Sequence, residues 1–230
     1  MSGFELSVGE LFQRHGAALL PVVTLISALG ILLCSIVVVA IVIERGVLVR
    51  RRRIIPTGFL DQVRRYWYRG DIQAALECCD EQRAALARIL RAGLRRHGAG
   101  MEEVEKALEG AGQVEANALN THVRGLGVVA NLAPMLGFLG TVTGMIKAFN
   151  AIAAAGTSNP SLVASGISEA LLTTAAGLLV GIPALALFHF FRGRVERYVV
   201  EMEEVTMELL EDLASQQRRV SHTEEQADAV

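Results

Sequence analysis

The sequence predicts an all-α membrane protein with three transmembrane helices and a helical cytoplasmic domain made by long extensions of the second and third spans. Of its 230 residues, 52% are hydrophobic. The excess lies in three uncharged runs, each long enough to cross a hydrocarbon core of about 30 Å as a helix. Lys and Arg gather on alternate sides of these runs, and apolar residues between the runs recur at helical spacing.

The distribution of basic residues predicts the orientation of the three spans. Of 22 Lys and Arg residues, 15 fall within residues 44–125 and five fall after residue 191. Because positive residues stay on the cytoplasmic side, we expect the N-terminus outside, the 44–125 region and the C-terminus in the cytoplasm, and residues 147–168 outside. The basic run 50–53 next to the first span favours a stop-transfer role over nucleic-acid binding.

Eight segments follow from these patterns. The N-terminal segment is either an amphipathic stretch at the outer interface or a flexible terminus, and the polar tail is expected to be disordered. Within 44–125, Asp71 is placed to cap a helix, and glycines at 98 and 100 interrupt the pattern before a helix that should run on into the second span. In order, the segments are a periplasmic N-terminal segment (1–15), transmembrane helix 1 (16–43), a cytoplasmic helical region (44–125), transmembrane helix 2 (126–146), a periplasmic linker (147–168), transmembrane helix 3 (169–191), a cytoplasmic helix (192–213) and a polar tail (214–230).

The second and third spans form a hairpin that carries small and hydroxylated residues as well as apolar ones. Such residues let helices approach closely and hydrogen-bond to each other, so these spans should face other helices and not only lipid. Thr141 and Thr174 are equally far from the middle of the linker, which places them at a similar depth. The residues expected to serve packing or kinks are Pro134, Gly137, Gly140, Gly144, Gly177, Gly181 and Pro183.

Glu169 is the only acidic residue between Glu115 and Glu196. An ionisable group at the edge of a membrane helix is a candidate functional residue. It is equally compatible with a helix-start carboxylate stabilised by the helix dipole. Threonine hydroxyls can support water or an ion in a polar seam but carry no proton as charge. If this hairpin conducts protons, a partner must therefore supply the carrier at mid-membrane.

The sequence shows no phosphate-binding loop, no His/Cys cluster and no arrangement of nucleophile and base. The three cysteines lack the spacing of a metal site or a disulfide framework. We therefore predict no enzyme activity, no cofactor, no metal site and no nucleic-acid partner.

Two segments of the hairpin resemble the signature of the ExbB/TolQ proton-channel family, whose relatives include MotA. They are NLAPMLGFLGTVTGMIKAF at residues 131–149 and GISEALLTTAAGLLVGIPAL at residues 166–185. The similarity is closest to the ExbB/TolQ branch and extends more weakly through 70–94 and 194–213. By this resemblance, Thr141 and Thr174 match pore-lining threonines and Glu169 matches the family's glutamate.

The resemblance implies an inner-membrane stator subunit that uses the proton-motive force. Its implied partners are four further copies in a homo-pentamer, a dimer of a single-span ExbD/TolR-like protein with a membrane aspartate, and a periplasm-spanning effector of the TonB/TolA type. Import across the outer membrane, envelope maintenance and gliding-type motility all fit. A non-conducting oligomeric scaffold is the main alternative, and a secondary transporter is disfavoured because three spans give no inverted repeat.

Overall fold

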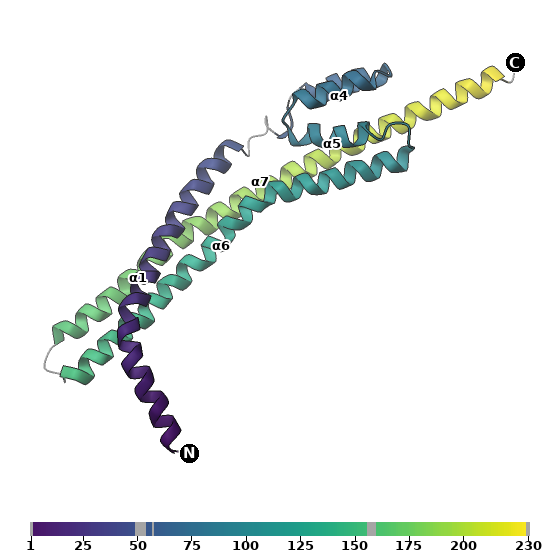
Figure 1. Cartoon of the computed structure of the whole chain (residues 1–230). Helices are drawn as coiled ribbons and strands as arrows, with labels where there is room; N and C mark the ends of the chain where they lie inside the picture. The colour runs from purple at the N-terminus through teal and green to yellow at the C-terminus, as the bar shows by residue number, and fades with distance from the viewer. Residues whose placement is uncertain (1, 49–53, 57, 156–159, 229–230) are drawn as a thin grey trace. The chain divides into compact units, whose positions relative to one another are not determined.

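The computed structural model describes residues 2–48, 54–56, 58–155 and 160–228, and no strand is present among them. Three helices in this part of the chain are long and apolar enough to cross a membrane. The chain is therefore an all-α, multi-pass membrane protein, as the sequence predicts. The helices, labelled as in Figure 1, are α1 (Ser2–Leu48), α3 (Phe59–Tyr68), α4 (Ile72–Glu81), α5 (Ala85–Leu94), α6 (Met101–Ala155) and α7 (Pro160–Asp228).

The chain divides into two compact units. The first, here called the membrane unit, holds residues up to Ile43 together with Val123–His189. The second, here called the polar unit, holds Glu44–His122 together with the chain from Phe190 onward. Helices α6 and α7 each contribute one part to each unit, and in each unit these parts lie side by side (Figure 1).

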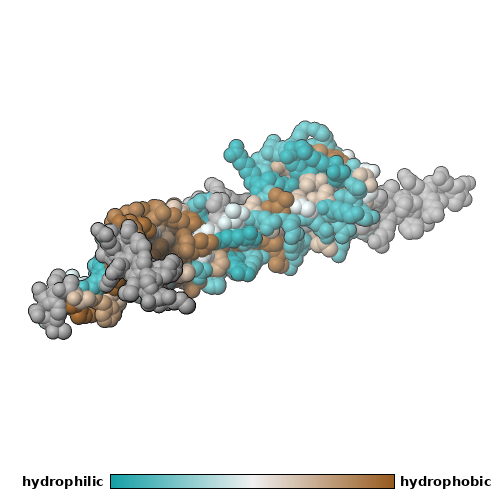
Figure 2. Space-filling view, turned by 60° about the horizontal axis from the view of Figure 1, so that its bottom comes forward, coloured by the Kyte–Doolittle hydropathy of each residue, from teal (hydrophilic) through white to brown (hydrophobic). Residues whose placement is uncertain are grey.

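In the membrane unit, the described side chains of α1, from Leu19 onward, are buried along one narrow face. Its buried side chains recur every three or four residues, which is the spacing of one helix face. They are Thr24, Ser27, Ile31, Cys34 and Val38. Large apolar side chains between them are exposed, including Leu25 and Leu33. Figure 2 shows hydrophobic residues gathered over one part of the visible surface. This distribution suits a helix with lipid on most sides.

In the polar unit, short helices are separated by turns that the sequence encodes. Gly70 follows α3 with φ of 74°, a conformation that glycine adopts at little cost, and its N–H bonds to the carbonyl of Trp67 at 2.9 Å. The next residue, Asp71, caps α4 by accepting the N–H of Ala74 at 3.1 Å. Gly98 and Gly100, with φ of 95° and 105°, separate α5 from α6. The predicted cap and the predicted break before α6 are both confirmed.

The core of the polar unit joins α3, α4 and α5 to the polar-unit parts of α6 and α7. Fully buried apolar side chains come from α3 to α5 and from α7. On α7, Val195, Met202 and Leu209 recur every seven residues, which places them on one face, and all three are buried. Arg64 of α3 bonds Glu208 of α7 at 2.8 Å. This ion-pair contact with the Glu208 carboxylate raises the pKa of the Arg64 guanidinium.

Helix α7 continues to Asp228, so the expected disorder after residue 214 is wrong; α7 contains no proline after Pro183 and no glycine after Gly193 to end it. Most of the predicted linker is helical, because α6 ends at Ala155 and α7 begins at Pro160. At the N-terminus, the backbone is helical from Ser2 and continues into the first span without a break. The basic run 50–53 lies outside the described part.

Candidate functional site

The two helices of the membrane hairpin meet along a seam of small residues. A Cβ atom added to Gly177 would lie 2.6 Å from the carbonyl oxygen of Ala133, and one added to Gly144 would lie 2.7 Å from the Cβ of Ala170. Similar close approaches occur at Gly137, at Gly140 and at Gly181, which contacts Pro134. The backbones are therefore in direct contact at Gly137, Gly144 and Gly177, and side chains of the opposite helix fill the seam at Gly140 and Gly181, so no space for water or an ion separates α6 from α7 at these positions. Pro183, in contrast, is exposed on α7.

The two predicted pathway threonines are connected through one carbonyl group. Thr174 donates its hydroxyl hydrogen to the carbonyl oxygen of Gly137 on the opposite helix at 2.9 Å. In an α-helix that same carbonyl accepts the N–H of residue 141. Thr141 donates its own hydroxyl to the carbonyl of Phe138 at 2.7 Å. Each hydroxyl thus uses its hydrogen within the protein and keeps acceptor capacity for water or a cation.

Thr141 and Thr174 lie at nearly the same depth in the hairpin. Gly140 is opposite Thr173, whose Oγ1 lies 2.3 Å from the position of an added Cβ. Thr141 and Thr174 are each one residue from this pair, in opposite directions along the axis. At about 1.5 Å per residue, their depths differ by about 3 Å at most. Both side chains are half-buried.

Glu169 forms an ion pair that joins the two helices of the hairpin. Its Oε1 lies 2.8 Å from the Nζ of Lys147, with 44% of the Glu169 side chain and 29% of the Lys147 side chain exposed. Lys147 is the only Lys or Arg between Arg124 and Arg192. Sequence analysis singled out Glu169 but did not predict this partner. The signal was available, because the hairpin holds one basic and one acidic residue near the same end.

The threonines and the ion pair lie on opposite flanks of the hairpin. Successive helical residues turn by about 100°, so Thr141 is about 120° from Lys147 around α6, and Thr174 is about 140° from Glu169 around α7. The seam residues lie between them on each helix. Since Lys147 and Glu169 touch on one side of the seam, Thr141 and Thr174 share the other side, here called the threonine flank.

Helix α1 packs on the flank that carries the ion pair. A Cβ at Gly30 would lie 2.9 Å from Leu136, and one at Gly125 would lie 3.6 Å from Ile41. Gly125, Leu136 and Lys147 are spaced by eleven residues, which is close to three full turns, so they form one stripe on α6. The threonine flank therefore lies away from α1. Apolar side chains beside the threonines on this flank are strongly exposed, among them Phe138 at 68% and Leu171 at 65%.

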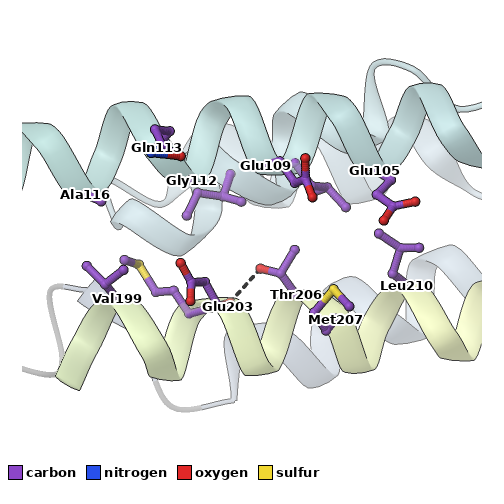
Figure 3. Close-up of a pocket in the computed structure, with 13 residues that line it drawn as sticks. Glu105, Glu109, Gly112, Gln113, Ala116, Val199, Glu203, Thr206, Met207 and Leu210 are labelled. Atoms are coloured by element: carbon purple, nitrogen blue, oxygen red, sulfur yellow. Dashed lines mark hydrogen bonds between the residues drawn. The ribbon is translucent and has the colours of Figure 1, made fainter. Parts of the chain in front are cut away.

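A separate cavity of about 560 Å³ lies in the polar unit (Figure 3). It is bounded by the facing parts of α6 and α7, with Ile89 contributed by α5. Three carboxylates line it, from Glu105, Glu109 and Glu203. Thr206 also lines the cavity and donates its hydroxyl hydrogen to the carbonyl of Met202 at 2.6 Å. The lining contains no His, Cys or Ser, and the described part of the chain has no cluster of metal-ligating side chains. This cavity offers no nucleophile paired with a base.

Comparison with known proteins places the hairpin within a described family. A model of the MotA/TolQ/ExbB proton channel family matches residues 81–204, more than half of the chain. All of Thr141, Lys147, Glu169 and Thr174 fall within the matched residues.

Individual relatives agree with the family model. A putative ExbB-like biopolymer transport protein of Synechocystis sp. is 30% identical over 79% of this chain and 87% of its own length. Biopolymer transport protein ExbB of Salmonella typhimurium is 36% identical over 37% of this chain and 35% of its own length. The ExbB protein of Pseudomonas putida is 38% identical over 37% of this chain and 27% of its own length. The chain thus spans most of the first relative and about a third or less of the other two. It belongs to the MotA/TolQ/ExbB proton channel family, with ExbB proteins among its relatives, and this is a family of channels and not a class of enzymes.

Proposed function

We propose that this chain is the proton-channel subunit of a stator complex in the bacterial inner membrane, driven by the proton-motive force. The observation that carries the proposal is the threonine flank. Two threonine hydroxyls, nearly level in depth, lie on the side of the hairpin away from α1; Thr174 donates to the Gly137 carbonyl, which also accepts the backbone N–H of residue 141, and Thr141 donates to the Phe138 carbonyl. Because the seam of small residues leaves no space for water, a proton path between α6 and α7 of a single chain is disfavoured. The path would instead run along the threonine flank, against another chain.

That other chain must supply the titrating group. Between Glu115 and Glu196, the only acidic residue is Glu169, which lies at the end of the hairpin and on the opposite flank. Hydroxyls can relay a proton through ordered water but cannot hold its charge at neutral pH. Exposed Phe138 and Leu171 suit contact with an apolar helix. The partner that fits is a single-span protein of the ExbD/TolR type with an aspartate in its membrane helix.

Family membership supports a proposal for the rest of the assembly. Five copies of this chain would surround a dimer of the partner, with the N-terminus in the periplasm and the C-terminus in the cytoplasm. Work would pass to a periplasm-spanning effector of the TonB/TolA type or to another envelope process. The relatives named as biopolymer transport proteins favour import across the outer membrane among these processes.

A non-conducting scaffold is the second candidate. It is supported by the hydrogen bond from the Thr174 hydroxyl to the Gly137 carbonyl, because this bond can hold α7 against α6 whether or not protons are conducted. The two functions differ in what they require of Thr141, because that hydroxyl bonds only within its own helix and adds nothing to the seam.

Valine substitutions separate the two candidates, because valine keeps the shape of threonine and removes the hydroxyl. We expect Thr141→Val and Thr174→Val to abolish proton flux in proteoliposomes that contain the chain and its partner, while the oligomer still assembles. Loss of the interhelical bond of Thr174 would by itself cost only about 0.6 kcal/mol. Wild-type flux in both variants would support the scaffold.

Matched controls lie beside each site. Thr143 is buried, and its hydroxyl bonds the carbonyls of Leu139 and Gly140 on its own helix. Thr173 likewise bonds only carbonyls of its own helix. Thr143→Val and Thr173→Val make the same chemical change away from the proposed path and should keep flux near the wild-type level.

A further inference from the structure

Lys147 and Glu169 are the only charged Lys, Arg, Asp or Glu residues from position 125 to position 191, and they contact each other. They are 22 residues apart and belong to different helices, so their pairing depends on how α6 and α7 pack. It is not a local pair between neighbouring turns of one helix. The net charge at this end of the hairpin therefore depends on Lys147 and Glu169, which are in contact.

Stability alone is a weak reason for such a pair. Both side chains are partly exposed, and ion pairs of that kind contribute little in water. The seam of glycines and alanines already fixes the packing of the two helices. The pair does determine where the Glu169 carboxylate lies, which is on the flank of α1 and away from Thr141 and Thr174.

The backbone around Glu169 ties this position to the threonines. In an α-helix such as α7 the Glu169 carbonyl accepts the backbone N–H of residue 173, which directly precedes Thr174. A shift of the backbone at Glu169 would thus displace the next turn of α7, where Thr174 makes its interhelical hydrogen bond.

We propose that Lys147 is a positioning residue for conduction, which holds the Glu169 carboxylate at the outer end of the hairpin by cross-helix charge pairing. This inference rests on the proposed function of the threonine flank. By this inference, conduction requires the pairing of opposite charges between Lys147 and Glu169 and not the Glu169 carboxylate alone. Lys147 touches no transported proton in this scheme and acts through Glu169.

The first test measures the contact itself, in the purified complete assembly. A water-soluble carbodiimide activates the Glu169 carboxyl, and the Lys147 amine then attacks it; an amide bond forms, and the carbodiimide leaves as its urea. We expect mass spectrometry to find peptides joined at Lys147 and Glu169 in the wild type. Lys147→Arg should give no cross-link, because a guanidinium does not react in this way. A wild-type assembly without this cross-link would overturn the proposal.

The second test measures proton flux in proteoliposomes, with the oligomer checked in parallel. We expect Lys147→Met to reduce flux as severely as Thr141→Val, and Lys147→Arg to keep it near the wild-type level. The exchange Lys147→Glu with Glu169→Lys should recover part of the flux that each single change removes. Full flux in Lys147→Met would overturn the role of Lys147 while leaving the proposed function intact. A cross-linked wild type without any flux would overturn the proposed function itself, and the conduction role of the pair with it.

Discussion

The glycine seam allows a quantitative prediction at Gly177. Ordinary van der Waals contact begins at 3.4 Å, but a methyl group here would lie 2.6 Å from the backbone oxygen of Ala133 and 3.0 Å from the Cα of Gly137. The obstacles are backbone atoms, which cannot rotate away, so α6 and α7 would have to part by roughly 0.8 Å. Forced overpacking of this kind costs about 1–3 kcal/mol. We expect Gly177→Ala to destabilise the hairpin by that amount, less the helical preference of alanine.

Gly193→Ala is the matched control. Gly193 lies in the same helix, and an added Cβ would meet nothing within 4 Å. Both substitutions gain the helical preference of alanine over glycine, about 1 kcal/mol, so the difference between them isolates the cost of the contact. The assay is equilibrium unfolding of the purified chain in mixed micelles by titration with a denaturing detergent, followed by circular dichroism. Equal stability of the two variants would refute a seam built on backbone contact.

Two further predictions concern the polar unit and the orientation of the chain. Burial, with smaller contributions from Cys78 and Asp80, raises the pKa of the Cys79 thiol to about 12. The Cys79 thiolate is therefore scarce at pH 8, and the rate of alkylation of Cys79 should rise about tenfold per pH unit below that pKa. The less buried Cys78 should be alkylated faster than Cys79. Equal alkylation rates of the two cysteines at pH 8, measured by mass spectrometry, would contradict this. The distribution of basic residues predicts that an impermeant maleimide added to intact cells labels a cysteine placed at Ser158, outside the described residues, and spares one placed at Ala99. Labelling at Ala99 would reverse the topology.

Local structure was predictable from sequence where a few neighbouring residues decide it. Asp71 caps a helix through its own side chain, and Gly98 and Gly100 break one through their backbone conformation. The continuity of α6 through the second span was predictable in the same way, since only Pro134 interrupts the apolar pattern of this helix. A proline is tolerated within a membrane span because groups on neighbouring helices can bond to the backbone groups that it frees.

The arrangement around the hairpin was not predictable to the same degree. Equal depth of Thr141 and Thr174 follows from counting residues, but their common flank depends on how each helix is rotated about its axis. That rotation is set by which glycines face which backbone atoms, a property of the packed pair. The bond from Thr174 to Gly137 and the pairing of Lys147 with Glu169 both depend on it.

Direct backbone contact also limits how the hairpin can deform. Flexible side chains between two helices act as a compliant layer, in which rotamer changes allow one helix to slide along the other. At Gly137, Gly144 and Gly177 that layer is missing, so sliding by even a fraction of a turn would drive Cα atoms against carbonyl groups. The two helices are therefore expected to move together as one stiff element. A working cycle would then consist of whole hairpins tilting or turning against their neighbours, and not of shear within a hairpin.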